Sequence, residues 1–288
     1  MKKVSEQSDF VKFLHRMFSR RIVIIGTIGV ILFVLIAIFA PLIATHDPAE
    51  MDMMHTKAKA SAEHILGTDK YGRDLFSRIV YGTRVSLLIG VASVLVAAVV
   101  GSFLGMLAAY NGGIVDTILM RFCDAFRAIP QIALCMALIA IYGNSLWSMS
   151  LIISITTLPD YIRMMRGSTL SITSSDYILA ARLSGEKDLK LMYKHIFPNS
   201  ISPIIIMASQ QIGASILMEA GLSFLGIGIQ VPTASWGAMV NEARPYLLTS
   251  PLYVLAPCAC IALLVISFNL FGDGIRDALD PSLRGTDK

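Results

Sequence analysis

Charge is what this sequence has least of. Only 15% of its 288 residues are Asp, Glu, Lys or Arg, whereas 55% are apolar, and a soluble domain of average composition carries about 25% charged residues. The scarcity is concentrated in five windows without a charged side chain: 22–45, 85–115, 128–159, 201–218 and 245–272. Because a helix crosses a bilayer with about 20 apolar residues, these windows exclude an ordinary soluble protein and predict an integral membrane protein.

Several motifs that carry chemistry are also missing. The chain contains no G-x-x-x-x-G-K-[ST] loop, so it is not expected to bind or hydrolyse ATP itself, and it has no H-E-x-x-H metalloprotease motif. Basic residues are not interleaved with aromatic ones, so no nucleic-acid partner is expected. Cysteines are few and lack the C-x-x-C spacing of zinc or redox sites: Cys123, Cys135, Cys258 and Cys260.

The charge-free windows predict an all-α integral membrane protein with six transmembrane helices. The expected spans are 22–44, 85–110, 117–142, 147–160, 201–228 and 252–271. The expected divisions are a cytoplasmic segment 1–21, a first transmembrane helix 22–44, an extracytoplasmic loop 45–84, a core 85–271 of five transmembrane helices with a connecting loop 161–199, and a cytoplasmic tail 272–288.

Two helix patterns refine this topology. The third span must tolerate three charged residues near one end: Arg121, Asp124 and Arg127. They lie close to one stripe of the helix and could face a protein interior or a pore. Small residues recur every four positions along the second span and predict that another backbone comes close to it: Ala97, Gly101, Gly105 and Ala109.

Basic residues predict the orientation, because loops rich in Lys and Arg stay in the cytoplasm. They are dense in segments 1–21 and 161–199, whereas the loop around Trp236 has only Arg244. With an even number of spans, both termini and the loop 161–199 are expected in the cytoplasm. The loop 45–84 fits less well, since it carries six basic residues, although six acidic residues offset their charge.

A charged, helix-forming stretch interrupts the apolar sequence at residues 177–198, which we call the elbow. The pattern predicts a helix over 176–183, a left-handed residue at Gly185 and a second helix from Asp188 that Pro198 ends. Apolar residues of the second helix share one face: Leu189, Met192, Tyr193 and Ile196. Such an elbow could lie on the membrane surface or fit a groove of a cytoplasmic protein.

A family resemblance bears on this choice. Ala180-Ala181, three residues, Gly185, nine residues and then HIFP resemble the signature loop E-A-A-x3-G-x9-I-x-L-P of binding-protein-dependent ABC importer permeases, with Leu179 in the place of the Glu. Three further stretches are similar to the dipeptide, oligopeptide and nickel branch: HILGTDKYGRDLFSRIVYGTRVSL from His64, EAGLSFLGIGIQVPTASWGAMV from Glu219, and FNLFGDGIRDALDPSLR from Phe268. Together these similarities extend from about residue 60 to the end of the chain.

The resemblance implies a type-1 ABC transporter permease, not an enzyme, in the cytoplasmic membrane of a bacterium. It implies a heterodimer with a second homologous permease, two ATP-binding cassette subunits that bind ATP and magnesium, and an extracytoplasmic substrate-binding protein. This chain itself is expected to bind lipid but no cofactor. The implied cargo is short peptides, or alternatively nickel or a metal chelate. The residues implied to couple to the ATPase are Ala180, Ala181, Gly185, Leu189, Met192, His195 and Pro198.

Polar residues within the fifth span are candidates for the translocation pathway. Glu219 lies toward the outer end of that span, where a charge is costly unless it faces water or a partner. It could line or gate the path, or it could make a structural hydrogen bond to a neighbouring helix. Gln210 and Gln211, nearer the middle of the span, are weaker pathway candidates.

No metal site is predicted. The loop 45–84 contains His46, His55 and His64, nine residues apart, and three methionines that could help to ligate a soft metal ion: Met51, Met53 and Met54. However, no secondary-structure repeat gathers these side chains, and a mobile loop is the ordinary interpretation of such a segment.

Two other classes of membrane protein are alternatives. A secondary transporter would need internal repeats or a buried proton relay, and the chain offers one buried acid and no clear repeat. An intramembrane serine protease could use Ser215, but no histidine lies in a predicted span to act as its base. Dependence of uptake on ATP, instead of on an ion gradient, separates the importer from a secondary transporter.

Overall fold

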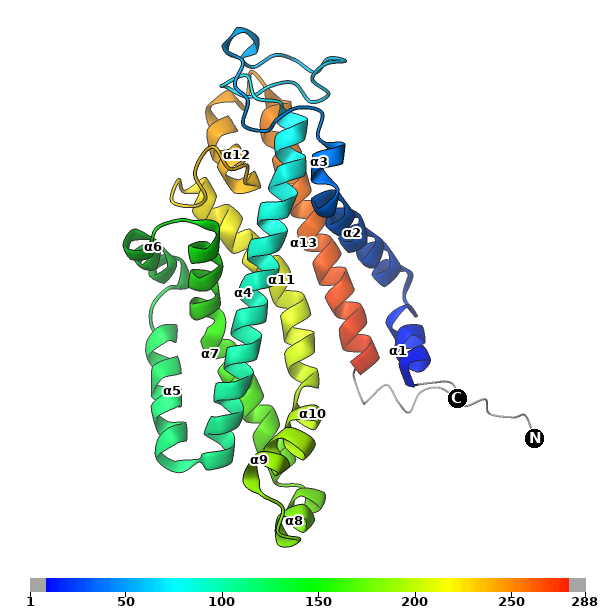
Figure 1. Ribbon diagram of the computed structural model, residues 1–288, viewed down its shortest axis with the longest axis vertical. Helices are drawn as coiled ribbons and strands as arrows, with labels where there is room; N and C mark the ends of the chain where they lie inside the picture. The colour runs from blue at the N-terminus through cyan, green and yellow to red at the C-terminus, as the bar shows by residue number, and fades with distance from the viewer. Residues whose placement is uncertain (1–8, 280–288) are drawn as a thin grey trace, which may run out of the picture.

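The computed structural model describes residues 9–279, and all regular elements in that range are helices. They form a bundle elongated along one axis (Figure 1). The main helices are α2 (Arg21–Ile38), α4 (Leu75–Asn111), α7 (Leu146–Thr173), α11 (Ser202–Phe224) and α13 (Pro251–Leu279). Residues 1–8 and 280–288, the outer parts of the predicted terminal segments, lie outside the described residues.

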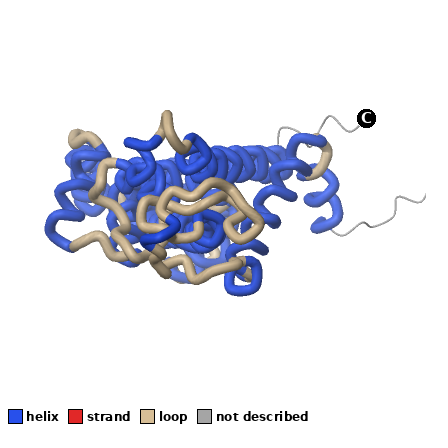
Figure 2. The backbone as a smooth tube through the Cα atoms, turned by 90° about the horizontal axis from the view of Figure 1, so that it is seen from above, coloured by secondary structure: helices blue, strands red, loops and turns tan. Residues whose placement is uncertain are grey.

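Shorter elements flank the main helices. They are α1 (Asp9–Met17), α3 (Ala40–Ile43), η1 (Met53–His55), α5 (Gly113–Arg127), α6 (Gln131–Tyr142), α12 (Trp236–Ala243) and η3 (Arg244–Tyr246), besides those of the elbow. The segment between α3 and α4, residues 44–74, forms loops at one end of the bundle, which we call the loop cap. The view from above shows these loops crossing over the helices (Figure 2).

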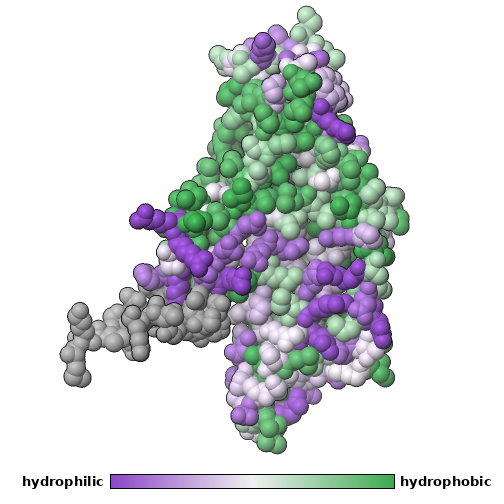
Figure 3. Space-filling model, turned by 180° about the vertical axis from the view of Figure 1, so that it is seen from behind, coloured by the Kyte–Doolittle hydropathy of each residue, from purple (hydrophilic) through white to green (hydrophobic). Residues whose placement is uncertain are grey.

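Within residues 9–279, four helices are long and apolar enough to cross a membrane: α2, α4, α11 and α13. The pair α5 and α6 would make a fifth span if the two are counted together, although they are bent by 93°. Apolar side chains on α2 point outward, such as Ile25 and Ile28, which are 65% and 59% exposed. Figure 3 shows apolar residues over much of the upper half of one face, with hydrophilic residues gathered below. Exposed apolar surface of this extent is suited to lipid.

The helix that carries the predicted second span begins before residue 85. α4 begins at Leu75 because Asp74 caps it, its carboxylate accepting the backbone N–H of Ser77. The helix has 37 residues, which at about 1.5 Å each make it roughly 55 Å long. Since the apolar core of a bilayer is about 30 Å thick, α4 must extend beyond it.

The predicted third and fourth spans also need correction. The third is not one helix, because Pro130, which has no N–H to continue α5, stands at the bend before α6. The fourth does not end near Pro159, which lies buried inside α7. Just before this proline, Thr157 Oγ1 donates to the carbonyl of Ile153 over 3.0 Å.

The last helix is longer than predicted. α13 continues to Leu279, so the first residues of the predicted tail, 272–279, extend the last helix without a break. Glycines allow this part to pack closely on its neighbours. A Cβ atom on Gly274 would lie 2.2 Å from Val23 of α2, and one on Gly272 would lie 3.1 Å from Gln210 of α11.

The predicted small-residue strip is confirmed where α4 crosses α7. A Cβ atom on Gly101 would lie 2.4 Å from Cβ of Tyr161, and one on Gly105 would lie 2.4 Å from the carbonyl oxygen of Ile162. Ala97, one turn earlier, is fully buried. The two backbones therefore approach at distances that no larger residue permits.

Replacing Gly105 by Ala is expected to destabilise the protein by about 1–3 kcal/mol, because the added methyl group forces α4 away from the α7 backbone. The matched control is Gly221→Ala in α11, where a Cβ atom meets nothing within 4 Å. Thermal unfolding of both variants in detergent measures the difference. Equal unfolding temperatures would show that the two helices are not packed as closely as described.

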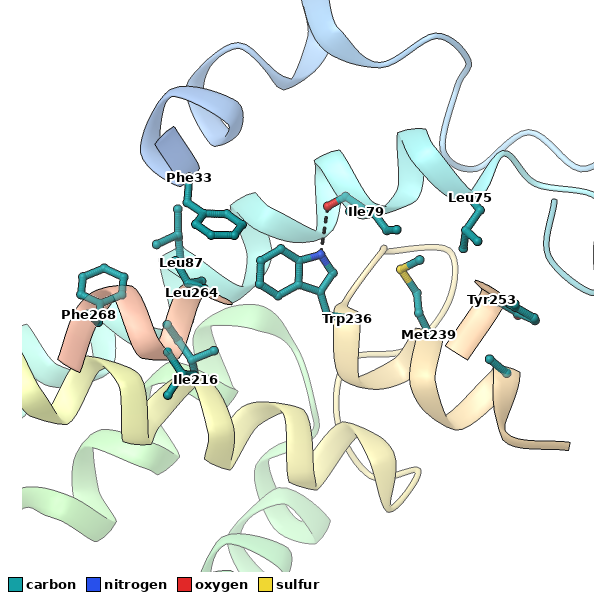
Figure 4. Close-up of a cluster of buried hydrophobic side chains, with 12 residues drawn as sticks. Phe33, Leu75, Ile79, Leu87, Ile216, Trp236, Met239, Tyr253, Leu264 and Phe268 are labelled. Atoms are coloured by element: carbon teal, nitrogen blue, oxygen red, sulfur yellow. Dashed lines mark hydrogen bonds between the residues drawn. The ribbon is translucent and has the colours of Figure 1, made fainter. Parts of the chain in front are cut away.

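A cluster of buried hydrophobic side chains lies under the loop cap and centres on Trp236 (Figure 4). Its indole N–H donates to the carbonyl of Ile79 over 3.0 Å, and its ring meets Phe33 edge-on at 5.9 Å between centroids. A Cβ atom on Gly82 would lie 2.7 Å from the indole, so Gly82 makes room for it. This core joins α2, α4, α12 and α13.

Candidate functional site

The elbow forms the end of the bundle opposite the loop cap (Figure 1). It consists of α8 (Asp176–Leu183), α9 (Asp188–Leu191), the π-helical turn η2 (Met192–Ile196) and α10 (Phe197–Ser200). Gly185 joins the two halves with a φ of +78°, which confirms the predicted left-handed residue. The prediction that Pro198 ends the second helix is wrong, because Pro198 lies in the first turn of α10, where a missing N–H costs nothing.

One side of the elbow is held firmly against the bundle. Ile178, Leu191 and Ile196 are at most 1% exposed and share a cluster with Tyr161 and Met165 of α7. Polar contacts also hold the elbow against the bundle. The hydroxyl of Tyr110 in α4 donates to Asp188, and the guanidinium of Arg182 lies 5.5 Å from the centroid of the Tyr110 ring. The elbow is therefore a packed part of the structure.

The other side presents apolar side chains outward. Leu183, Leu189 and Tyr193 are about 80% exposed, and Leu179 is 56% exposed. The single apolar face predicted for the second helix is thus wrong. Met192 and Ile196 turn inward while Leu189 and Tyr193 turn outward, because η2 is more loosely wound than the α-helix on which the prediction was based. We call the outward side chains of the elbow the docking face; they are Leu179, Leu183, Leu189 and Tyr193.

The residues predicted to couple to an ATPase are spread over both sides of the elbow. Ala180, Gly185, Leu189 and Pro198 are exposed, Ala181 and His195 are half-buried, and Met192 is buried.

A contact that the sequence analysis missed lies within the second half of the elbow, directly after Gly185. Glu186 accepts from Lys190 Nζ at 2.6 Å and from His195 Nε2 at 2.9 Å. The hydrogen bond from Lys190, with the positive charges of Lys190, His195 and Lys194, lowers the pKa of the Glu186 carboxyl. The i, i+4 spacing of Glu186 and Lys190 could have predicted the ion pair between them from the sequence.

Glu219 is fully buried within this chain. Its carboxylate accepts hydrogen bonds from Ser235 at 2.7 Å and Ser223 at 2.8 Å, and a longer one from Ser86 at 3.5 Å. These partners come from α4, α11 and the segment before α12. The arrangement favours the structural alternative for Glu219, a carboxylate that ties a helix to its neighbours.

The two glutamines lie in less enclosed positions. Gln210 is exposed and its amide reaches Asp273 of α13 at 3.4 Å, while Gln211 is half-buried.

A row of ion pairs between α5 and α7 was only partly foreseen. Arg127 pairs with Asp160 and Asp124 with Arg163, each at 2.5 Å, and Asp116 accepts Arg166 Nη2 at 2.6 Å. Two of the three charged residues predicted to share a stripe of the third span therefore face α7. A cavity of about 670 Å³ lies beside this row, lined by Arg127, Asp160, Arg163, Met164, Gly167, Ser168, Ser171, Pro203 and Met207.

A buried charge cluster lies at the opposite end of the bundle. Asp69 is paired with Nε of Arg73 at 2.5 Å and with Nε of Arg78 at 3.5 Å, and Glu242 of α12 accepts from Arg73 at 2.8 Å. Asp69, Arg73 and Arg78 are at most 1% exposed. The cluster fastens the loop cap to α4 and α12. Three of its members fall in the family-like stretch from His64, but no spacing in the sequence pointed to Glu242.

Comparison with known proteins gives the family. The description "Binding-protein-dependent transport system inner membrane component" matches residues 101–285, and "N-terminal TM domain of oligopeptide transport permease C" matches residues 8–60. Among solved structures, a chain of the methionine ABC transporter MetNI in inward-facing conformations has the same fold, with a TM-score of 0.56 and 19% identity, covering 70% of this chain and 96% of that one.

Curated relatives are similar over nearly the whole length. The dipeptide transport system permease protein DppC of Alkalihalophilus pseudofirmus is 41% identical, covering 92% of this chain and 88% of the relative. The probable D,D-dipeptide transport system permease protein DdpC of Escherichia coli is 44% identical, covering 89% and 86%. The glutathione transport system permease protein GsiD of Pectobacterium atrosepticum is 40% identical, covering 97% and 93%. The chain therefore belongs to the family of inner membrane components of binding-protein-dependent transport systems.

Proposed function

We propose that this chain is the permease of an ATP-driven importer for short peptides and that a separate ATPase subunit grips its elbow. The observation that carries the proposal is the docking face. Its four outward apolar side chains stand on the helices of the elbow, whose other side is packed into the bundle. Apolar side chains exposed to this degree on a seated element are typical of a surface that fits a partner's groove.

The proposed topology keeps six spans. They are α2, α4, the bent pair α5 and α6, α7, α11 and α13. Both termini and the elbow then face the cytoplasm of a bacterial cell, and the loop cap faces outward. The loop cap and the elbow lie at opposite ends of the bundle, and α1 and the end of α13 lie toward the end of the elbow (Figure 1), as this orientation requires.

The proposed assembly supplies what this chain lacks. Two ATPase subunits bind ATP and magnesium, and the sequence of this chain has no loop for that purpose. A second, homologous permease completes the pathway as a heterodimer, and an external binding protein delivers the cargo. The names of the relatives, which refer to dipeptide, D,D-dipeptide and glutathione transport, support a short peptide as the cargo.

Within the pathway, the polar groups fall into two proposed roles. Glu219 holds its neighbouring segments together through its three hydroxyl partners. Gln210 and Gln211 remain pathway candidates on α11. The cavity beside the α5–α7 ion pairs adds a further candidate, since its charged walls suit a cargo with both an amino and a carboxyl terminus.

The lever role of the elbow can be tested at Gly185. Gly185→Val is expected to leave the protein in the membrane but to reduce ATP-driven uptake strongly, because a β-branched residue is strained at a φ of +78° by about 1–2 kcal/mol. Gly185→Asn is the control, since Asn tolerates the left-handed conformation. A Cβ atom here meets nothing within 4 Å, so neither variant is expected to clash at this atom, and backbone strain is the main expected difference. Uptake that is normal in both variants would remove the lever role.

The energy source is tested by reconstituting the chain with the second permease, ATPase and binding protein that co-purify with it. Uptake of a labelled dipeptide into proteoliposomes should need ATP and should persist when ion gradients are collapsed. Uptake that follows an ion gradient without ATP would instead indicate a secondary transporter.

A further inference from the structure

Two histidines of the loop cap meet at the start of α4. His64 Nδ1 lies 2.9 Å from Asp74 Oδ1, and His46 Nδ1 lies 3.9 Å from the same oxygen. The imidazole rings are stacked with a tilt, their centroids 4.8 Å apart. His55, the third histidine of the loop, is elsewhere, exposed and bound to Asp52 at 2.7 Å. The sequence spacing had given no reason to expect His46 and His64 together.

The three side chains are fixed in place by the surrounding backbone and hydroxyl groups. The N–H of His46 donates to Ser77 Oγ at 3.0 Å, and the N–H of His64 donates to Ser61 Oγ at 3.0 Å. Asp74 is 2% exposed, and its Oδ2 accepts the N–H of Ser77 at 2.8 Å. This leaves Oδ1 directed at the two imidazoles, so the donor atoms are arranged before any ligand arrives.

The space in front of the histidines is strongly acidic. A cavity of about 160 Å³ is lined by His46, Asp47, Glu50, Asp52, Glu63, His64, Gly72 and Asp74. No Lys or Arg lines it. The cavity therefore carries negative charge near neutral pH, and a cation would relieve the repulsion among its carboxylates.

We propose that His46, His64 and Asp74 bind a divalent first-row transition metal ion of the zinc and nickel type. Imidazole nitrogens with a carboxylate oxygen are ligands that such ions prefer over calcium or magnesium. One donor atom from each residue lies within 4.8 Å of the others, whereas donors around a tetrahedral zinc ion are about 3.4 Å apart. Small side-chain rotations close that difference, and a carboxylate of the cavity or a water molecule completes the coordination.

A bound ion would cross-link the loop cap. His46 follows α3, His64 lies in the middle of the loop, and Asp74 is the capping residue of α4. Their joint coordination would hold residues 46–74 as one unit on the outer end of the bundle. This role is independent of the cargo and of ATP coupling, so the site and the proposed function stand or fall separately.

The test uses the full chain, without a histidine tag, in lipid nanodiscs. Zinc is titrated in competition with a chromophoric chelator, and one zinc ion per chain is expected. His64→Ala and His46→Ala should each raise the Kd at least about tenfold. Asp74→Asn should do the same, and since Asn is also a good helix cap, α4 should remain intact. His55→Ala is the matched control and should bind like the wild type.

A second readout separates a built site from adventitious binding. Zinc should raise the unfolding temperature of the wild type and of His55→Ala, but not that of His64→Ala, because only a site in the folded protein links binding to stability. Equal zinc affinity in the wild type and His64→Ala would overturn the proposal. So would an equal loss of affinity in His55→Ala and His64→Ala, which indicates an adventitious ion only.

Discussion

Exchanging Leu189 for Asp is expected to reduce ATP-driven uptake about tenfold or more while the folded chain stays in the membrane. Leu189 is 81% exposed, so the change should alter the free energy of unfolding by no more than about 0.5 kcal/mol. In a docked complex the same side chain would be desolvated, and a central apolar contact typically contributes about 2 kcal/mol to binding. A buried, unpaired carboxylate would add to that loss.

Uptake into proteoliposomes and co-purification of the ATPase measure this effect together. Leu189→Met is the control, because it keeps an apolar side chain of similar volume. Both readouts should fall for Leu189→Asp and stay normal for Leu189→Met. If the aspartate variant retains its ATPase subunit and its uptake, the docking face lies elsewhere on the chain.

Removing Asp69 should cause the largest loss of stability, about 3–5 kcal/mol, since two buried guanidinium groups then keep Glu242 as their one acidic partner among the described residues. Asp69 pairs with both Arg73 and Arg78, and it also accepts the backbone N–H groups of Tyr71 and Arg73. Asp69→Ala would therefore loosen the loop cap from α4. Thermal unfolding in detergent and the yield of folded protein measure the loss.

An exposed ion pair provides the comparison for Asp69. Arg20 lies 3.2 Å from Asp277 with its side chain 66% exposed, and such pairs usually contribute less than about 1 kcal/mol. Arg20→Ala should thus unfold within a few degrees of the wild type. If Asp69→Ala were as mild as Arg20→Ala, the buried cluster would not be what fastens the loop cap.

Features set by local sequence were predictable. The charge-free windows gave the all-helical membrane class, and the four-residue repeat of small side chains gave the close approach of α4 and α7. The left-handed conformation of Gly185 was expected because it follows an amphipathic helix and precedes another. Each depends on residues that belong to one continuous segment of the chain.

Features that depend on tertiary contacts were missed. The bend between α5 and α6 and the continuation of α7 through Pro159 are opposite outcomes for two prolines, decided by the neighbouring packing. The pair of Arg73 and Glu242 is separated by 169 residues. The inward and outward division of the second elbow helix required the π-helical turn, for which the sequence has no clear signal.

The most direct test of the account is to cross-link the elbow to its motor. Leu189→Cys, in membrane vesicles that also contain the ATPase subunit, is treated with a photoactivatable thiol reagent. The native cysteines are buried or half-buried, so the new thiol should react first. Leu248→Cys is the control, since Leu248 is 97% exposed just before α13, at the end opposite the elbow. We expect a cross-linked adduct with the ATPase subunit for the cysteine at position 189 and none for the cysteine at position 248, and we expect the reagent to reach position 189 from the cytoplasmic side. Labelling of position 189 from the outside would contradict the proposed function. So would adducts of position 189 that contain no ATPase subunit.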